Sequence, residues 1–228
     1  MVTTWKFIGG RLCLDFVNTV AGWVSGGGRR GRDYADTVLR DKLPRYEDLL
    51  AWAQCAGALT RNESRRLGRR ALSDPRAAAS AMARAAELRA ALYRIFKSAV
   101  EHWPPRPADM EVLQRELSMA SAHQRLARVS GAYVWRWDDS DPTLERVLWP
   151  VAGSAAELLT SNDLAMIRQC GGDACGWMFL DTSRNHSRQW CTMRECGNRA
   201  KVKSFRRREA ANAFAAMALS ETSGRTIQ

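Results

Sequence analysis

Four cysteines in the last third of the chain constrain its fold more than any other feature. They form two close pairs, Cys170 with Cys175 and Cys191 with Cys196, in the pattern C-x4-C-x15-C-x4-C. Two such pairs separated by the length of a hairpin suit a tetrahedral metal site, because each pair offers two thiolates to the same ion. Four thiolates leave no coordination position for water or substrate, so the pattern predicts one structural Zn²⁺ ion rather than a catalytic centre.

Two disulfides, or four separate buried thiols, are the alternatives to a zinc site. Disulfides need an oxidising compartment, and the chain does not open with the basic and apolar stretches of a secretory signal. We therefore expect zinc, and a cytoplasmic protein. The two remaining cysteines, Cys13 and Cys55, have apolar neighbours and are expected to be small buried hydrophobic side chains.

The cysteines lie in a strongly basic part of the chain. Residues 164–210 contain ten Lys or Arg against four Asp or Glu, a net charge of +6. A small basic zinc module typically binds nucleic acid, since cations that neutralise phosphates release counterions. A solvated face that serves only solubility is the alternative. The candidate nucleic-acid contacts are Arg184, Asn185, Arg188, Arg194, Arg199, Lys201, Lys203, Arg206, Arg207 and Arg208.

These candidates divide by the contacts that their side chains can make. Arg184 and Arg188 suit bidentate contacts to guanine, and Asn185 suits adenine. The cations of the helix expected after Cys196 suit phosphates, which give affinity without sequence discrimination. Asp181 is expected to hold one of the arginines in place. A salt bridge to the helical part of the protein is the alternative role for any of these arginines.

The run Cys196-Gly197-Asn198-Arg199 resembles the signature of the CGNR zinc finger. The likeness extends through Cys175-Gly176-Trp177, Ser183-Arg184-Asn185 and Trp190-Cys191. The opening of the chain, GGRLCLDFVNT at residues 9–19, resembles the start of the ABATE domain that usually accompanies this finger. The resemblance implies a bacterial transcription regulator, of a family partly linked to stress, in which the finger is the DNA-binding part.

The chain of 228 residues is long enough for one medium domain and a small module. We expect a helical domain over residues 1–163 and the finger over 164–228. The helices are expected at about 44–57, 60–72, 75–102, 108–121 and 141–161, the last kinked at Pro150, with a hairpin at 124–137 around Ser130-Gly131. Residues 11–20 fit a strand or a helix equally. The fold class is mainly α with a small β-hairpin (α+β), a helical domain followed by a treble-clef-like four-cysteine zinc finger.

Within the finger the expected order is knuckle, hairpin, knuckle and helix. Trp177 and Phe179 alternate on a strand and are expected to form the small core with Trp190. Asn198 is expected to cap a helix over about 199–217. The candidate packing positions on that helix are Lys201 or Val202, Phe205, Ala213 and Phe214.

Polar side chains among apolar ones mark a candidate ligand pocket in the helical domain. Asp15 and Asn18 either line a pocket for a small-molecule effector or hydrogen-bond to neighbouring backbone, and the second role is favoured. Trp135 and Trp137 share a face of the expected hairpin, where they either join such a pocket or pack on the helices. Gly26-Gly27-Gly28 lacks the Gly-Lys-Ser/Thr ending of a phosphate-binding loop and is expected to be a surface loop.

The sequence favours a DNA-binding transcription regulator whose partner is double-stranded DNA. One finger covers only a few base pairs, so a homodimer is expected. An RNA-binding or ribosome-associated protein is the alternative, and exposed Trp177 or Trp190 would favour it, because RNA recognition stacks unpaired bases on aromatic rings. No enzyme is expected, since the three histidines lie outside catalytic motifs. No apolar run approaches the ~20 residues of a membrane span, so we expect no membrane contact. A DNA-binding protein is also expected to join the nucleoid when it is bound to DNA.

Overall fold

The computed structural model describes residues 5–24, 37–138, 143–173 and 175–223, and most of them are helical. The helices are α1 Leu12–Val17, α2 Tyr46–Cys55, α3 Arg61–Ser73, α4 Pro75–Val100, α5 Pro107–Ala122, α6 Trp149–Leu159 and α7 Asn198–Ser223. The antiparallel two-stranded sheets of the described residues are β1 Val20–Val24 with β2 Thr37–Asp41, β3 Gln124–Val129 with β4 Ala132–Trp137, and β5 Ile167–Gln169 with β6 Met178–Leu180. The predicted fold class, mainly α with small β elements, is confirmed.

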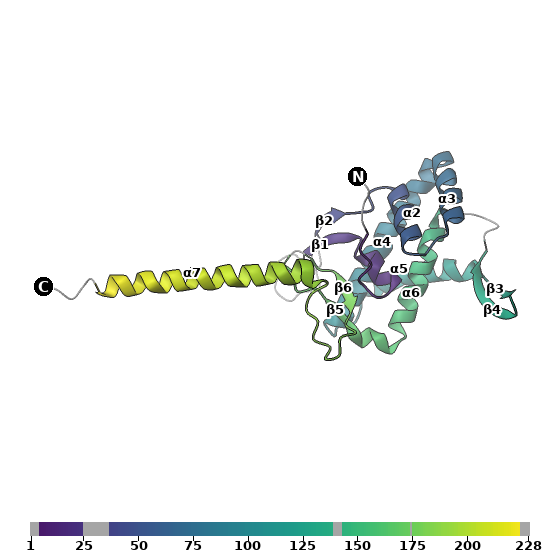
Figure 1. The fold of residues 1–228 in the computed structure, drawn as a ribbon. Coiled ribbons are helices and arrows are strands. Elements are labelled where there is room, and N and C mark those ends of the chain that lie inside the picture. The colour runs from purple at the N-terminus through teal and green to yellow at the C-terminus, as the bar shows by residue number, and fades with distance from the viewer. Residues whose placement is uncertain (1–4, 25–36, 139–142, 174, 224–228) are drawn as a thin grey trace.

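Figure 1 shows α1–α6 gathered in one body, from which the β3–β4 hairpin and α7 project at opposite ends. Within the described ranges, no helix has the length and apolar character needed to cross a membrane. The predicted surface loop at Gly26-Gly27-Gly28 lies outside the described residues.

The central helix of the body is α4, and its amino terminus follows from the sequence. Asp74 caps it by accepting a hydrogen bond from the Ala77 amide at 3.0 Å, and Pro75 occupies the first position, where the missing N–H removes no hydrogen bond. Apolar side chains recur every three or four residues, so one stripe of the helix is buried. Leu88 and Leu92 on that stripe are fully buried, and α4 contacts α1, α2, α3 and α5.

Residues 11–20 contain both of the structures that the sequence left open. The six-residue helix α1 comes first, the chain turns at Asn18 and Thr19, and β1 follows. Both turn residues are buried although they are polar. Thr19 satisfies its hydroxyl by donating to the Phe16 carbonyl at 2.7 Å.

The β3–β4 hairpin forms where the sequence predicts it. Ser130 and Gly131 both have positive φ, 50° and 87°, as a type I′ turn requires, and the twist of that turn suits a two-residue hairpin. Of the two tryptophans that share one face, Trp137 packs against Trp149 with ring centroids 5.5 Å apart, whereas Trp135 is 67% exposed.

Two predictions in the helical domain are wrong. The helix expected over 141–161 is a short 3₁₀ helix, Leu144–Leu148, followed by α6, and Pro150 lies in the first turn of α6 instead of kinking a longer helix. A first-turn proline removes no helical hydrogen bond, so it begins α6 without strain. Cys55 is exposed rather than buried, because it lies at the end of α2 and off its buried stripe.

The β5–β6 hairpin joins the helical domain to the cysteine-rich part. Met178 and Leu180 lie in the core of the helical domain, whereas Phe179 between them lies in the core around the cysteines. A strand sends alternate side chains to opposite faces, so one short strand serves both cores. Asn18 fixes its position: Nδ2 donates to the Met178 carbonyl at 2.7 Å, and Oδ1 accepts from the Met178 amide at 2.9 Å. The boundary predicted after residue 163 falls just before this hairpin, in a short 3₁₀ helix.

Replacing Asn18 by alanine tests this attachment. Asn18→Ala leaves the carbonyl and the amide of Met178 buried without partners, so we expect the free energy of unfolding to fall by about 2–4 kcal/mol. Urea denaturation followed by circular dichroism measures the change. Asn62→Ala, at an exposed position of α3, is the matched control and should change stability by less than about 0.5 kcal/mol. Equal losses in the two variants would contradict the role given to Asn18.

Candidate metal centre and nucleic-acid interface

The four predicted metal ligands lie together. The Sγ atoms of Cys170, Cys175, Cys191 and Cys196 are all within 4.8 Å of one another, and all four residues are buried. The Sγ of Cys191 is 3.6 Å from that of Cys175 and 3.5 Å from that of Cys196. Sulfurs bound tetrahedrally to zinc at about 2.3 Å lie about 3.8 Å apart, so this cluster fits one structural zinc ion. The same distances are far longer than the ~2.05 Å of a disulfide bond.

The backbone and one arginine support the sulfurs from outside. A Cβ on Gly172 would lie 3.2 Å from the Sγ of Cys196, so a larger residue in the first knuckle would push against the second pair. The Cys191 amide donates to the Sγ of Cys170 at 3.3 Å, and Nη2 of Arg199 donates to the Sγ of Cys196 at 3.2 Å. Such donors stabilise a site in which four thiolates carry more negative charge than zinc neutralises.

Without a cation, the four thiols compete for protons. Hydrogen bonding to Cys175 lowers the pKa of the Cys170 thiol, and the same contact raises the pKa of Cys175 to about 12. Hydrogen bonding to Cys170 also raises the pKa of Cys191. Four clustered thiolates therefore require a positive ion among them, and zinc supplies that charge when bound.

Aromatic side chains pack around the sulfurs as the sequence predicts. Trp177 and Phe179 are buried in one cluster with the four cysteines, and Trp190 and Ile8 pack against it. Nε1 of Trp177 donates to the Val20 carbonyl at 2.7 Å, which ties the cluster to β1 of the helical domain. The metal site, its aromatic core and its attachment thus form one continuous structure.

Comparison with protein families agrees with this geometry. Residues 166–209 match the CGNR zinc finger, and residues 10–162 match ABATE, described as "Putative stress-induced transcription regulator". The chain belongs to the ABATE family. A search of curated proteins found no match. The two resemblances seen in the sequence are confirmed, and the chain is a zinc-finger protein of a regulatory family.

The loop of the CGNR finger after β6 closes around Asp181. This buried carboxylate accepts hydrogen bonds from the Ser183 amide at 3.0 Å, the Ser183 hydroxyl at 2.5 Å and the Arg188 amide at 2.9 Å. The bonds from Ser183 and Arg188 hold the pKa of Asp181 below its usual range. The loop therefore has a defined shape that leaves Arg184 and Asn185 exposed.

Arg188 directs its donors into the finger instead of toward solvent. Its Nε donates to the Trp190 carbonyl at 3.0 Å, Nη2 donates to the Cys191 carbonyl, and the guanidinium lies 4.1 Å from the centre of the Phe179 ring. The side chain thus positions the second cysteine pair. The predicted contact of Arg188 with guanine is not supported, because the donors that would read the base are bound within the finger.

The helix after the second cysteine pair begins differently from the prediction. A single π-helical turn, Met193–Gly197, precedes α7, and the Thr192 hydroxyl caps it by accepting from the Glu195 amide at 3.3 Å. Asn198 is already helical and its Nδ2 donates backward to the Arg194 carbonyl at 3.2 Å, so it does not act as the cap. The sequence held the signal for the true cap, since Thr followed three residues later by Glu is the spacing of a capping box.

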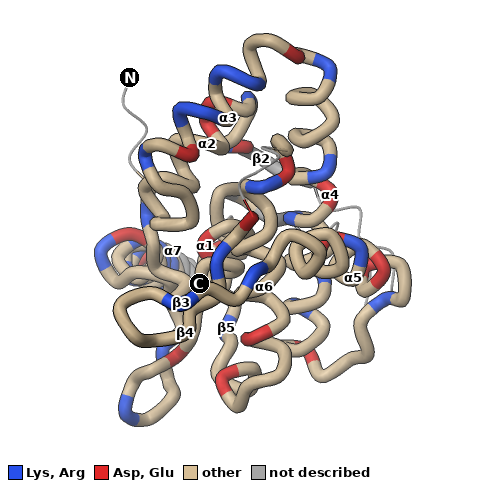
Figure 2. The backbone as a smooth tube through the Cα atoms, turned by 90° about the vertical axis from the view of Figure 1, so that its right-hand side faces the viewer, with Lys and Arg blue, Asp and Glu red and all other residues tan. Residues whose placement is uncertain are grey.

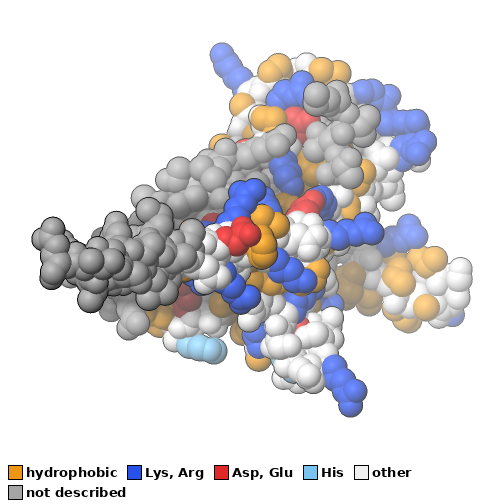
Figure 3. Space-filling model, turned by 60° about the vertical axis from the view of Figure 1, so that its left-hand side comes forward, with side chains coloured by type: hydrophobic (Ala, Val, Ile, Leu, Met, Phe, Trp, Pro, Cys, Tyr) orange, Lys and Arg blue, Asp and Glu red, His pale blue; other side chains and the backbone are white. Residues whose placement is uncertain are grey.

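The first turns of α7 and the turn before them form the basic surface of the finger. The predicted cations there are all exposed: Arg194, Arg199, Lys201, Lys203, Arg206, Arg207 and Arg208. Figure 3 shows Lys and Arg side chains around the place where α7 leaves the body. Val202 and Phe205 are 50% and 61% exposed, so the expectation that they pack is wrong, because α7 projects away from any covering element. The side chains of Ala213 and Phe214 lie outside the described residues.

A groove runs between the first cysteine pair and α7. Its volume is about 520 Å³, and Arg199, Lys203 and Arg207 line its helical side. A spacing of four residues places these cations along one stripe of the helix. Lys203 forms a salt bridge with Asp173, which also lines the groove. The groove is therefore a basic surface built by the zinc knuckle and the helix together.

The structure does not bring the candidate pocket residues of the helical domain together. The Asp15 carboxylate accepts from the Gly9 amide at 2.8 Å, and burial raises its pKa to about 6. The Asn18 amide is bound to the Met178 backbone, and Trp135 lies on the projecting hairpin. Backbone hydrogen bonding, the favoured interpretation, is what the structure shows for Asp15 and Asn18.

Removing one thiolate tests the metal site. With Cys191→Ser we expect the purified protein to lose its zinc and the finger to unfold, because metal binding supplies much of the folding free energy of so small a module. Elemental analysis measures the zinc, and thermal denaturation measures the unfolding. Cys55→Ser removes an exposed thiol outside the cluster and should retain one zinc ion per chain. The same zinc content in both variants would overturn the assignment.

Proposed function

We propose that this chain is a DNA-binding transcription regulator whose CGNR finger docks on double-stranded DNA. The observation that carries the proposal is that one finger presents both a closed loop, which exposes Arg184 and Asn185, and the exposed cations at the start of α7. The loop supplies side chains suited to base edges, and the helix supplies side chains suited to phosphates. Sequence-specific binding needs both kinds of contact.

The ion pairing of the Lys and Arg side chains on α7 supports this helix as the phosphate-binding element. Lys201 and Arg206–Arg208 form no ion pair with any described residue. Lys203 is already paired with Asp173, and Arg199 is hydrogen-bonded to a sulfur of the metal site. Unpaired cations are free to neutralise phosphates without first breaking a salt bridge. A projecting α-helix of about 10–12 Å diameter also fits the major groove, which is about 12 Å wide.

RNA binding by the finger is the less favoured alternative. Trp177 is 5% exposed and its indole N–H is bound to Val20, while Trp190 is half-buried against the cysteine cluster. Both rings are placed for packing rather than for stacking on an unpaired base. Phe205 is an exposed aromatic of the finger and lies between cations of α7, where an apolar side chain can contact a thymine methyl group.

In this proposal the regulator works as a homodimer, because one finger covers few base pairs and two-fold symmetry doubles the recognised site. The helical domain provides the dimer contact or binds a small-molecule effector. The protein acts in the cytoplasm and joins the nucleoid when bound to DNA. It has no catalytic role, since a site filled by four thiolates has no position for a substrate.

Salt dependence tests the phosphate contacts. Arg207→Ala should weaken binding to every duplex alike and reduce the slope of log K against log salt concentration by about 0.9, the value for one phosphate. Fluorescence anisotropy titrations at several salt concentrations measure the slope. Arg45→Ala removes an exposed arginine of the helical domain that is paired with Asp48, and it should leave the slope unchanged. An unaltered slope in Arg207→Ala would remove this part of α7 from the interface.

Sequence readout tests the loop. Selection of bound fragments from random duplex DNA gives the preferred site, and Arg184→Ala should weaken binding to that site by about 1–3 kcal/mol while leaving random duplex nearly unaffected. Arg188→Ala is the comparison, because it should lower the thermal stability of the finger instead. Equal losses of Arg184→Ala on both DNAs would make Arg184 a phosphate contact. Failure to enrich any duplex would contradict the proposed function.

A further inference from the structure

The β3–β4 hairpin exposes aromatic side chains that the finger does not use. In its antiparallel register Leu126 faces Trp135 and Arg128 faces Tyr133, so these four side chains share one face of the ribbon. Trp135 is 67% exposed, Tyr133 70% and Leu126 59%. Large apolar side chains that are contiguous on one face and exposed to solvent form a candidate binding surface, since such side chains are largely buried on average.

The same ribbon is basic on both faces. Arg125 and Arg136 lie directly opposite each other on the second face, while Arg128 lies beside the aromatic rings. Asp138 is 3.4 Å from Arg125, but Arg128 and Arg136 form no ion pair with the described residues. Like charges directly opposite each other disfavour a hairpin, and Asp138 offsets Arg125 but leaves Arg136 for an anion.

The base of the hairpin is fixed to the helical domain. Trp137 packs on Trp149, and the Arg146 guanidinium lies 5.1 Å from the centre of the Trp137 ring. Nη2 of Arg146 is 2.5 Å from Oε1 of Glu63, at the start of α3. The exposed rings near the turn are therefore presented on a ribbon whose root is anchored to α3 and α6.

Helix α3 adds a second basic element at this end of the molecule. Arg61, Arg65, Arg69 and Arg70 are exposed and form no ion pair within the described ranges. The carboxylate of α3, Glu63, is engaged in the anchor. Figure 1 shows α3 and the hairpin at the end opposite α7, and Figure 2 shows the concentration of basic residues along α3.

We propose that this hairpin surface binds single-stranded nucleic acid. Its members are Leu126, Arg128, Tyr133 and Trp135 on one face of the ribbon, with Arg136 on the opposite face and the exposed arginines of α3 at the same end of the molecule. Unpaired bases stack on Trp135 and Tyr133, a phosphate next to a stacked base pairs with Arg128, and phosphates farther along the strand pair with the other arginines. Bases within a duplex are stacked on one another, so their faces are closed to these rings. The surface shares no residue with the CGNR finger, and the inference goes beyond the duplex binding proposed for that finger.

Charge argues against the other occupants of an exposed aromatic face. A second copy of the chain would bring two ribbons with three arginines each into contact, and among the described residues of strands β3 and β4 and the position after them Asp138 is the carboxylate that offsets them. A protein partner would need an acidic surface. The positive charge of the ribbon is the one feature that would favour such a partner. Nucleic acid satisfies the rings and the arginines with one ligand.

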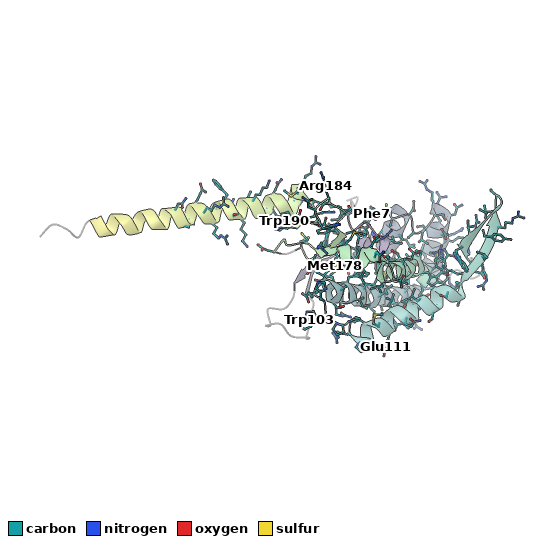
Figure 4. All side chains as sticks on the ribbon, turned by 90° about the horizontal axis from the view of Figure 1, so that it is seen from below. Phe7, Trp103, Glu111, Met178, Arg184 and Trp190 are labelled. Carbon is teal, nitrogen blue, oxygen red and sulfur yellow. The ribbon has the colours of Figure 1, made fainter. Side chains whose placement is uncertain are left out.

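The test uses full-length, zinc-loaded protein and three fluorescein-labelled probes, oligo-dT and oligo-rU of about 20 nucleotides and a duplex of equal length. Trp135→Ala and Tyr133→Ala should each raise the Kd for single strands about tenfold, since a stacked base contributes strongly to affinity. Both should leave the Kd for the duplex within about twofold. Trp103→Ala is the matched control, because Trp103 is 45% exposed and lies in the connection between α4 and α5, labelled in Figure 4. The ratio of the dT and rU affinities identifies DNA or RNA as the source of the strand.

Unchanged single-strand binding in the Tyr133→Ala/Trp135→Ala double variant would overturn the proposal, as would an equal loss in Trp103→Ala. Loss of self-association, or of binding to an acidic peptide, in place of strand binding would also overturn it. Arg207→Ala keeps this test distinct from that of the finger, because it should weaken duplex binding and leave strand binding intact. If the protein binds single strands through Trp135 but binds no duplex, the result contradicts the function proposed for the finger and supports strand binding by the hairpin surface.

Discussion

Four thiolates that can share one metal ion hold the carboxyl-terminal third of this chain in shape. The aromatic core around them consists of few side chains, and it would not by itself order the two knuckles and the loop between them. Because β6 contributes Phe179 to this core and Met178 and Leu180 to the helical domain, the metal site is built onto that domain and not tethered to it. A shift of Asn18 or Val20 would move the first knuckle directly, since both bond to residues of the finger.

Arginine has three different roles within this small module. Arg199 stabilises a zinc-ligand sulfur, Arg188 is stacked on Phe179 and bound to two carbonyls, and Arg184 remains exposed. The guanidinium group allows all three because it combines five donors with a flat surface that stacks on aromatic rings. The local backbone decides among the roles: the loop closed by Asp181 turns Arg188 inward and Arg184 outward.

The molecule has basic surfaces at both of its ends, and they differ in character. At α7 the cations surround a projecting helix, which matches the width of a duplex groove. At the β3–β4 hairpin the arginines stand beside Tyr133 and Trp135, which suit the faces of unpaired bases. The two proposals therefore assign a duplex to α7 and an unpaired strand to the hairpin, each on the chemistry of its own side chains.

Local patterns in the sequence determined much of this protein. The cysteine spacing predicted the metal site, Ser130-Gly131 predicted the hairpin, and Asp74-Pro75 predicted the start of α4. Each of these features depends on residues close together in the chain, where sterics and hydrogen bonding are decided within a few positions. The cap at Thr192 is also a local feature: the spacing of Thr192 and Glu195 indicates it, although the prediction named Asn198 as the cap.

Only the tertiary structure decided the roles that depend on distant neighbours. Asn18 bonds to Met178 across 160 positions of the sequence, and nothing near Asn18 in the chain reveals that partner. Trp135 and Trp137 are the same residue type on the same face of β4, yet Trp137 packs against Trp149 whereas Trp135 is exposed to solvent. Phe205 has an apolar side chain suited to packing but lies on a helix that has left the body. Burial is set by which elements come together in space, and that assembly is a property of the whole chain rather than of any local segment.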